Sequence, residues 1–327
     1  MGSDTNHSVA VIVPCFRVKD TVIQVVTEAL RFADAVYCVD DACPEQSGKL
    51  VESTFDDPRV KVHFSTRNGG VGSAVKIGYK AAMCDGHRIL VKIDGDGQMD
   101  PSLIPLFTGP IKAGVADYCK GNRFYELGFL KGMPALRILG NSMLSLIAKL
   151  SSGYWKLLDP TNGYTAIHAG VLGQLPLDKV HDRYFFESDL LFRLYISRAV
   201  VRDIPMRARY GNEVSNLRIS RQVLPFLFGH LKNFFKRIFY TYFLRDFNIA
   251  TLQLIVGLML GLFGVVFGVS AWHQSIQSGI PASAGTVMLA GLPSIVSVQL
   301  LLSFLNYDIQ NLPSHSLCGT LDADRQD

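Results

Sequence analysis

The sequence predicts an α/β fold with a mostly parallel, doubly wound sheet, followed by a hydrophobic helical hairpin. Short apolar and β-branched runs alternate with segments of helical periodicity in the first part of the chain. Polar or glycine-rich turns follow several of these runs, which is typical of loops gathered at one edge of an open sheet. Two segments near the C-terminus lack Lys, Arg, Asp and Glu and are long enough to cross a bilayer.

The expected elements alternate between strand and helix as far as the fourth strand. Val9 begins a run of β-branched residues that ends before Pro14, which favours a buried strand. The expected strands are 9–13, 34–39, 60–64, 89–93, 117–120 and 200–208, and the expected helices are 20–32, 47–55, one from the loop 67–73 to 82, 101–113, 136–150 and 185–195. Strands joined through helices pair in parallel, because each helix crosses over one face of the sheet.

Asp94 and Asp96, separated by one glycine, directly follow the expected strand 89–93. Two carboxylates this close repel each other unless a cation lies between them, and hard oxygen ligands suit Mg²⁺ or Mn²⁺. Gln98 could add a neutral oxygen on the same side. The same residues also fit an acidic turn ahead of a helix at Pro101, because Asp and Gly are ordinary turn residues. The pattern alone leaves both interpretations open.

Further polar patterns lie at the ends of other elements. Asp40 and Asp41 end the second expected strand, and the glycine-rich loop 67–73 opens the next helix. Such a loop can aim backbone N–H groups at a phosphate, but it lacks the Lys-Ser/Thr of a P-loop, and a tight turn explains it equally well. Glu187 and Asp189 fall in the first turn of a helix, where compensation of the helix dipole is the favoured interpretation.

Composition narrows the class of protein. A net charge of +4 on 327 residues, with no basic block of interleaved aromatics in the first half, argues against a nucleic-acid partner. The six cysteines form no C-x-x-C pair, so we expect reduced thiols in a cytosolic compartment. Met1 to Ser8 are polar, and we therefore expect no signal peptide.

The chain changes character at Val223. Phenylalanines and tyrosines alternate with Lys and Arg up to Arg245, which suits helices at the lipid headgroup boundary; an amphipathic helix packed on the preceding domain is the alternative. The uncharged segments 249–271 and 286–305 predict two transmembrane helices, joined by a polar turn at 273–279. Basic residues precede this hairpin and its turn has none, so the N-terminal domain and the tail are expected in the cytoplasm. The expected parts are 1–220, 221–248, 249–305 and 306–327.

Several short motifs occur in a specific order. They are Val13-Pro14-Cys15-Phe16, Val39-Asp40-Asp41, Asn68-x-Gly70-x-Gly72-x-Ala74, Asp94-Gly95-Asp96-Gly97-Gln98-Met99-Asp100-Pro101 and Gly121-Asn122-Arg123. With the C-terminal hairpin, this series resembles the polyprenyl-phosphate glycosyltransferases, the dolichol-phosphate mannose synthase-like branch of the family 2 inverting glycosyltransferases. The resemblance covers most of residues 9–310 and implies a GT-A (Rossmann-like) fold. Arg17-Val18 replaces the family's Asn-Glu, and Val71 and Thr165 replace a frequent Lys and Arg, which leaves the donor open.

The resemblance also implies the residues of the site. A nucleotide-sugar would be bound by Pro14, Phe16, Asp40, Asp41, Asn68, Gly70, Gly72, Lys76, Asp94, Gly95 and Asp96. Mg²⁺ or Mn²⁺ would be held by Asp94, Asp96 and Gln98, and the lipid phosphate by Arg123, Arg137, Asn141 and Arg218. The catalytic set would be Asp94, Asp96, Arg123 and Asp159, with the loop 159–164 shaping the sugar site.

The implied reaction is inverting transfer of a monosaccharide to a polyprenyl phosphate, at the cytoplasmic face of the cell inner (plasma) membrane. UDP-glucose or UDP-N-acetylglucosamine with undecaprenyl phosphate is the favoured pair, and GDP-mannose with a dolichol-type lipid stays open. The resemblance further implies a multi-pass membrane protein that forms a homo-oligomer, a tetramer.

Two rival classes remain. A membrane glycosyltransferase acting on a sugar hydroxyl would need a general base, for which Glu187-Ser188-Asp189 is the nearest acidic motif, although the chain has no Q-x-x-R-W segment. A membrane-anchored sugar-nucleotide sensor would not need to keep a metal site, so the intact Asp94, Asp96 and Gln98 argue against it.

Overall fold

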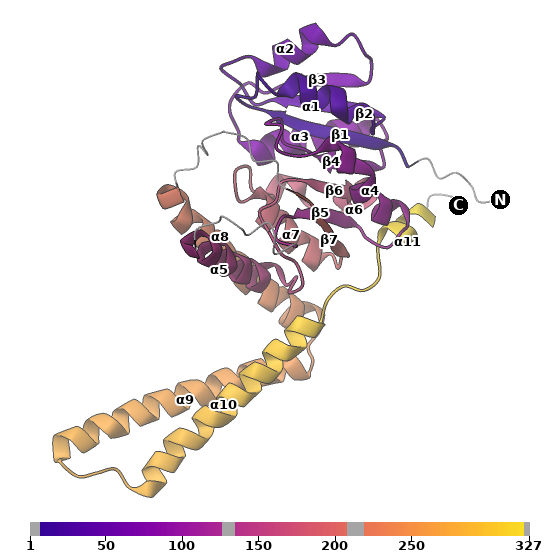
Figure 1. The fold of residues 1–327 in the computed structure, drawn as a ribbon. Coiled ribbons are helices and arrows are strands. Elements are labelled where there is room, and N and C mark those ends of the chain that lie inside the picture. Colours follow the sequence, from indigo (N-terminus) through magenta and orange to yellow (C-terminus); the bar gives the residue numbers. More distant parts are fainter. Residues whose placement is uncertain (1–6, 126–134, 208–218, 324–327) are drawn as a thin grey trace. The chain divides into compact units, whose positions relative to one another are not determined.

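The structure, a computed structural model, describes residues 7–125, 135–207 and 219–323 (Figure 1). The chain divides into two compact units. The first comprises the residues up to Phe234 together with those from Pro313 onward, and the second comprises Phe235–Leu312. The first unit holds the sheet and the residues expected in the site, and the second holds the hydrophobic hairpin.

The sheet of the first unit has seven strands in the order β3-β2-β1-β4-β6-β5-β7. The strands are β1 Val9–Cys15, β2 Ala35–Asp40, β3 Val60–Phe64, β4 Ile89–Lys92, β5 Tyr118–Asn122, β6 Thr165–His168 and β7 Val201–Pro205. Only β6 is antiparallel, and it lies between β4 and β5. The mostly parallel α/β fold is therefore confirmed. Because β6 runs the opposite way, its amino end lies at the same edge as the carboxyl ends of β4 and β5.

The central strands are buried on both faces, which explains their continuous apolar runs. Val11 and Val13 of β1 belong to a core cluster with side chains of the helices α1 (Val22–Ala29) and α4 (Ile104–Lys112). Ile12 points to the other face, where α3 (Val71–Cys84) passes so closely that a Cβ on Gly78 would lie 2.6 Å from the Ile12 side chain. The alternation of side chains along the strand thus places one helical layer on each face.

Three further helices of this unit agree with the predicted ones to within a few residues: α2 Ser47–Thr54, α5 Ala135–Ser152 and α7 Phe186–Ile196. A 3-10 turn Pro101–Leu103 precedes α4, and the short helix α6 Ala169–Gly173 has no predicted counterpart. The strand expected at 117–120 extends further, because Gly121 and Asn122 pair with Ile204 and Pro205 of β7. Arg123 is consequently the first residue beyond the strand.

Helix α8 (Ile219–Phe239) has one face packed on the first unit. The His230 Nδ1 lies 2.7 Å from the Ser151 Oγ of α5, and the Asn233 side chain donates to Asp189 of α7. Leu224 and Phe228 of the same helix remain exposed. An amphipathic helix with one packed face and one exposed apolar face is compatible with the predicted position at a membrane surface, which stays a prediction.

The second unit contains α9 (Ile249–Ser278) and α10 (Ala284–Gln310), which are long and apolar enough to cross a membrane by length and composition. They pack through small residues: the Ser297 Oγ donates to the Gly257 carbonyl at 2.7 Å, and a Cβ on Gly264 would collide with Ser294. The polar turn expected at 273–279 is wrong in position. Residues up to Ser278 continue α9, and the left-handed Gly279 (φ 67°) ends it, because glycine adopts that conformation without strain.

A buried ion pair lies at the foot of the hairpin, inside the second unit. Arg237, fully buried, donates from Nη1 and Nη2 to the two carboxylate oxygens of Asp308 at 2.6 and 3.0 Å. The Tyr242 hydroxyl, from the π-helical turn Tyr240–Arg245, donates to the same carboxylate at 2.6 Å. Arg237, one of the basic residues of the segment expected at the headgroup boundary, therefore neutralises a buried carboxylate of the protein.

The tail beyond the hairpin returns to the first unit. The buried Asp117, at the start of β5, accepts from the Ser316 hydroxyl and the Cys318 N–H on Oδ1, both at 2.8 Å. Its Oδ2 accepts from the Val200 N–H at 2.7 Å. Helix α11 (Cys318–Ala323) follows, and its Asp322 lies 3.4 Å from Arg88. Both ends of the hairpin are thus joined by the chain to the same unit.

Candidate functional site

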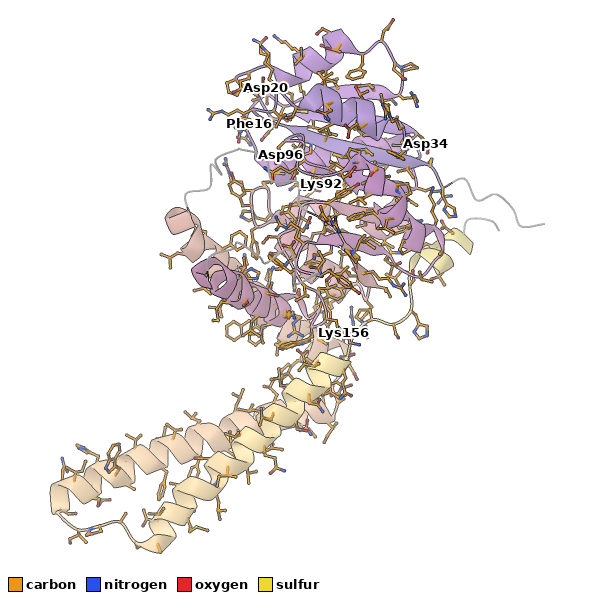
Figure 2. All side chains as sticks on the ribbon, in the orientation of Figure 1. Phe16, Asp20, Asp34, Lys92, Asp96 and Lys156 are labelled. Carbon is orange, nitrogen blue, oxygen red and sulfur yellow. The ribbon has the colours of Figure 1, made fainter. Side chains whose placement is uncertain are left out.

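The predicted site residues at the ends of β1, β2, β4 and β5 lie at the edge of the sheet where these strands have their carboxyl ends. Figure 2 shows Phe16 and Asp96 at this edge, while Asp34 lies at the opposite one. Asp94 follows β4, and Arg123 follows β5. The loop 159–164 leads into the antiparallel β6, which lies between them. Because β6 is antiparallel to β4 and β5, the loop that precedes it lies between the residues that follow these two strands.

Lys92, the last residue of β4, lies beneath the aspartate pair. Its ammonium is 2.9 Å from the Asp94 Oδ1 and 3.0 Å from the Glu187 Oε1 of α7. The Lys92 side chain is 1% exposed and that of Asp94 is 32% exposed. Burial by itself would lower the pKa of Lys92, but the charges of Asp94 and Glu187 more than offset burial and raise that pKa above its ordinary value. The counter-ion expected between close carboxylates is, for Asp94, a lysine of the protein.

Gly163 closes over this ion pair. A Cβ at this position would lie 2.6 Å from the Lys92 Nζ and 2.7 Å from the Asp94 Oδ2, so a side chain would displace one of them. The next residue, Tyr164, stacks on Phe107 with ring centroids 4.0 Å apart and donates from its hydroxyl to the Asp100 carbonyl at 3.1 Å. The loop is fixed on both sides of the glycine.

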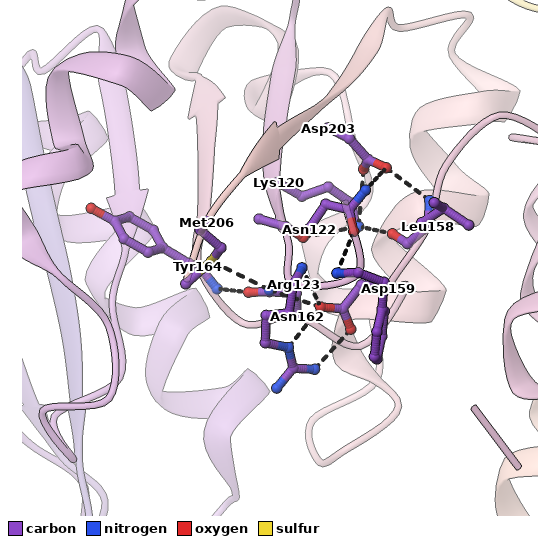
Figure 3. A network of polar contacts seen from close by, with 11 residues as sticks. Lys120, Asn122, Arg123, Leu158, Asp159, Asn162, Tyr164, Asp203 and Met206 are labelled. Atoms are coloured by element: carbon purple, nitrogen blue, oxygen red, sulfur yellow. Dashed lines mark hydrogen bonds and ion pairs between the residues drawn. The ribbon is translucent and has the colours of Figure 1, made fainter. Parts of the chain in front are cut away.

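A second ion pair lies on the β5 side (Figure 3). Arg123 donates from Nε and Nη2 to the two oxygens of Asp159, each at 2.7 Å, and its backbone N–H also reaches Asp159. The Asp159 side chain is 2% exposed and that of Arg123 is 35% exposed. Burial would raise the pKa of Asp159, but Arg123, with help from Lys120, holds it below its ordinary value. Asp159 therefore holds the guanidinium in place.

Beneath this pair lies a further buried pair, Lys120 with Asp203 (Figure 3). The two charged groups are 3.1 Å apart, Lys120 also donates to the Leu158 carbonyl, and Asp203 accepts from the Leu158 N–H at 2.8 Å. Asn122 donates to the same carboxylate at 3.1 Å. Burial dominates both groups: it lowers the pKa of Lys120 and raises the pKa of Asp203. These residues fix the backbone of the loop just before Asp159.

Asp40, the last residue of β2, and Asp41, which follows it, have structural partners. Asp41 accepts from the Gly69 and Gly70 N–H groups at 2.8 and 2.7 Å, so it fastens the glycine-rich loop. Asp40 accepts from the Cys43 and Gly48 N–H groups, at 2.7 and 2.8 Å, and fixes the start of α2. These contacts give each carboxylate a role in the fold, and a contact of either with a nucleotide stays a prediction.

The glycines of the loop are likewise explained by packing. Gly70 has a φ of 94°, and a Cβ on it would lie 2.9 Å from the Asp182 carbonyl. A Cβ on Gly72 would lie 2.6 Å from the His181 carbonyl. Lys76, further along α3, bonds the Asp182 carboxylate and the Val180 carbonyl, at 2.5 and 2.9 Å. The loop is thus built around the segment 180–183, and its contact with a phosphate stays a prediction.

Asp94 and Asp96 are suitable for a divalent metal only in part. Among the residues that the structure describes, no group of three His, Cys, Asp or Glu side chains is placed to hold a metal ion. Both carboxylates are nevertheless partly exposed, and the Asp96 Oδ1 accepts from the Gln98 N–H at 3.0 Å, which fixes that turn. Mg²⁺ in nucleotide sites is commonly held by one or two carboxylates plus substrate phosphates. The carboxylate ligands of Asp94 and Asp96 therefore fit a metal ion that a diphosphate helps to bind.

The remaining predicted residues are placed less fully. Phe16 is 40% exposed at the site edge, Pro14 is the last but one residue of β1, and Gly95 is buried against Val18. Asn68 lies exposed in the glycine-rich loop. Arg137 and Asn141 lie on α5, but their side chains are outside the described part of the structure, as is Arg218 altogether.

Sequence reasoning missed the two buried lysines. Lys92 and Lys120 each interrupt an otherwise uncharged, buried strand, and a charge at such a position requires a partner. A buried lysine in a strand thus indicates that a carboxylate lies nearby, but it does not identify which one. The carboxylates are Glu187 of α7 for Lys92 and Asp203 of β7 for Lys120. Glu187, interpreted as dipole compensation, is the partner of Lys92.

Comparisons with known proteins agree on one family. The model of the family described as Glycosyl transferase family 2 matches residues 10–175. An undecaprenyl-phosphate mannosyltransferase from Micrococcus luteus is 31% identical over 160 residues, which are 48% of this chain and 65% of that enzyme. A UDP-N-acetylglucosamine–dolichyl-phosphate N-acetylglucosaminyltransferase from Methanococcus voltae is 30% identical over 160 residues, 49% of this chain and 63% of that enzyme.

These matches cover just under two thirds of each relative. A dolichol-phosphate mannosyltransferase from Pyrococcus furiosus is 25% identical over 184 residues, 55% of this chain and 51% of that enzyme. Among solved structures, S. aureus TarS 1-349 in complex with UDP-GlcNAc aligns over 93% of this chain and 92% of that one, at 12% identity and a TM-score of 0.43. That likeness is too distant to inform function.

Proposed function

Because the chain belongs to glycosyl transferase family 2, we propose that it transfers a monosaccharide from a nucleotide-sugar to a polyprenyl phosphate at a membrane surface. The sequence relatives support this acceptor, since their names specify undecaprenyl, dolichyl and dolichol phosphates. They differ in the sugar, mannose or N-acetylglucosamine, so the donor stays open among UDP-glucose, UDP-N-acetylglucosamine and GDP-mannose.

The observation that carries the proposal is the loop from Asp159 to Gly163. At one end it holds the Arg123 guanidinium, and at the other it packs on the Lys92–Asp94 pair. Carboxylates and a guanidinium are therefore held by the same five-residue segment. A diphosphate with its metal and an acceptor phosphate need those two kinds of group side by side.

The residues would divide the work as follows. Asp94 and Asp96, with the oxygen of Gln98, would hold Mg²⁺ or Mn²⁺, which when bound would stabilise negative charge on the leaving diphosphate. Arg123 would position the acceptor phosphate for in-line attack at the anomeric carbon. A phosphate oxygen is already ionised near neutral pH, so a strong general base is unnecessary. Binding and orientation by fixed charges would then supply most of the rate enhancement.

Transfer to a sugar hydroxyl is less well supported, because it needs a base. Asp189 accepts from the His181 N–H on one oxygen, with Arg193 on the same oxygen, and from Asn233 on the other. Glu187 is paired with Lys92. Both members of the acidic motif are thus held in place by hydrogen bonds or ion pairs within the fold.

Membrane attachment is part of the proposal. We propose that α9 and α10 cross the plasma membrane as a hairpin, that the first unit lies in the cytoplasm, and that the protein works as a homo-oligomer. The return of the tail to Asp117 supports a hairpin that enters and leaves the bilayer on the same side. The basic residues before α9 support the cytoplasmic side.

The test uses full-length protein in detergent with radiolabelled UDP-glucose, UDP-N-acetylglucosamine and GDP-mannose in parallel. Undecaprenyl phosphate and a short dolichyl phosphate are the acceptors, and undecaprenol, which lacks the phosphate, is the matched control. We expect label from one donor in the organic phase with either phosphate and none with undecaprenol. Label that enters a soluble or polymeric sugar instead would show a hydroxyl acceptor and contradict the proposal.

A further inference from the structure

Lys92 already occupies the position of a cation at the aspartate pair. Its ammonium contacts Asp94 at 2.9 Å and Glu187 at 3.0 Å, and its side chain is buried. The lysine is the last residue of β4, Glu187 comes from α7, and the loop at Gly163 passes so closely that a Cβ there would collide with the Lys92 ammonium and the Asp94 carboxylate. Three elements therefore keep one positive charge against the inner side of Asp94.

A fixed ammonium at this distance opposes the approach of a divalent cation to the same carboxylate. Asp94 and Asp96 supply two negative charges, and Lys92 offsets part of them. A metal held by the protein alone would have to share Asp94 with this lysine. A metal that arrives with a diphosphate has extra negative oxygens around it, so the repulsion is compensated by the ligand.

We propose that Lys92 is an internal counter-ion that keeps the aspartate pair from binding a divalent metal unless a diphosphate completes the site. Lys92 is in this sense a positioning residue: it orients Asp94 and makes metal binding depend on the donor. The part of this inference that concerns the donor rests on the proposed function. The part that concerns Lys92 and the bare metal does not.

The experiment measures Mn²⁺ binding to full-length protein in detergent by electron paramagnetic resonance, first without any nucleotide. We expect weak Mn²⁺ binding by the unaltered protein and at least tenfold tighter binding by Lys92→Met, which leaves Asp94 and Glu187 without their cation. Glu187→Gln should weaken Mn²⁺ binding, because Lys92 then acts on Asp94 alone. Lys92→Arg retains the charge and should bind Mn²⁺ as weakly as the unaltered protein.

A purely structural role predicts a different pattern. If Lys92 only stabilised the fold, Lys92→Met would lower the unfolding temperature and leave the Mn²⁺ dissociation constant unchanged, and that result would overturn the proposal. Should Lys92→Met fail to fold, Lys92→Gln, which retains a hydrogen-bond donor, takes its place with the same expected direction. The double variant Lys92→Met/Asp94→Asn must lose the gain, since the tighter binding is assigned to Asp94.

The second stage adds UDP or GDP as the diphosphate. Either nucleotide should tighten Mn²⁺ binding by the unaltered protein more than by Lys92→Met, because the variant no longer needs the ligand to offset a lysine. Equal tightening in both proteins would contradict the coupling. Since none of these measurements involves transfer, failure to glycosylate a lipid would remove the proposed reaction and leave the counter-ion result standing, and the reverse also holds.

Discussion

Two ion pairs at the same edge of the sheet have the same chemistry in opposite placement. In the pair Lys92–Asp94 the cation is 1% exposed and the carboxylate is 32% exposed. In the pair Arg123–Asp159 the carboxylate is 2% exposed and the guanidinium is 35% exposed. Each pair buries one charge and presents the other. Burial of a charge is tolerated only with a close partner, so the hidden member fixes the visible one.

The difference shows how one edge can receive ligands of both signs. The β4 side presents carboxylates, which suit a metal cation, and the β5 side presents a guanidinium, which suits a phosphate. The strand β6 lies between them, and its preceding loop touches both pairs. Variants that remove the visible member of each pair should therefore affect different substrates.

The largest effect is expected from the β4 pair. Asp94→Asn, which removes the exposed carboxylate of the Lys92–Asp94 pair, should lower kcat by on the order of 10²-fold or more, the size found when one preorganised electrostatic contact is removed. Chelation of divalent metal with EDTA should abolish the activity of the unaltered protein, and Mg²⁺ or Mn²⁺ should restore it. Asp178→Asn, at an exposed carboxylate paired with Lys80, is the matched control. Full activity in EDTA would remove the metal from the mechanism.

The pair Arg123–Asp159 should give the next largest effect, and the property affected should be the binding of the lipid phosphate. Loss of a charge-assisted bidentate contact costs about 1.5–3 kcal/mol, so Arg123→Ala should raise the KM for the lipid phosphate at least tenfold. Donor binding measured by calorimetry should stay nearly constant. Arg123→Lys should recover part of the loss, because lysine keeps the charge without the planar fork.

Two controls accompany this variant, because Arg123→Ala also leaves a buried carboxylate unpaired. Arg123→Ala/Asp159→Asn removes that carboxylate charge and should restore stability without restoring lipid affinity. Arg59→Ala, at an exposed pair with Asp57, should change neither property. Equal loss of donor and lipid affinity in Arg123→Ala would show that the two pairs are not separate in function.

The smallest expected effect is on how stability changes in acid. Two aspartates of one buried network, Asp159 and Asp203, should change it in opposite directions. The pKa of Asp159 is lowered in the folded protein, so its contribution to stability is present at neutral pH and is lost as the pH falls through that folded value. The pKa of Asp203 is raised, so its contribution is present in acid and is lost as the pH rises through that value.

Urea unfolding of the full-length protein between pH 3 and pH 7 checks these signs. Asp159→Asn should flatten the loss of stability in acid, whereas Asp203→Asn should steepen it, because the group that gains from protonation is gone. Parallel curves for the two variants would mean that neither aspartate titrates as its surroundings indicate. Both variants leave the partly exposed carboxylates of the β4 side in place.

Much of the fold could be predicted because it follows from local patterns. β1 is a continuous apolar run rich in β-branched residues, β3 alternates valine with polar residues, and the acidic and glycine-rich turns follow strand ends. The antiparallel direction of β6 could not be predicted from such local patterns. Residues 165–168 form a short apolar strand in either direction, and only its place between β4 and β5 makes it antiparallel.

The site was predicted as a set of residue types rather than as a set of contacts. Asp94 and Arg123 are predicted at strand ends, but the contacts around them are distant in sequence. Glu187 lies 95 residues from Lys92, the partner of Asp94, and Asp159 lies 36 residues from Arg123. The same limit applies to Asp41, whose carboxylate bonds the glycine loop. Long-range pairing depends on the fold as a whole, so single motifs do not determine it.

The tail that reaches Asp117 is synthesised after both apolar helices. It provides two of the three hydrogen bonds described for that buried carboxylate, from Ser316 and Cys318. On the proposed membrane topology, a newly made chain completes this part of its sheet only once the hairpin has been inserted and the tail has come back to the sheet's own side. A chain whose last segment stayed across the bilayer would keep an unsatisfied carboxylate at the start of β5, a defect that would expose the chain to cellular proteases. Correct insertion and completed folding would then be one event.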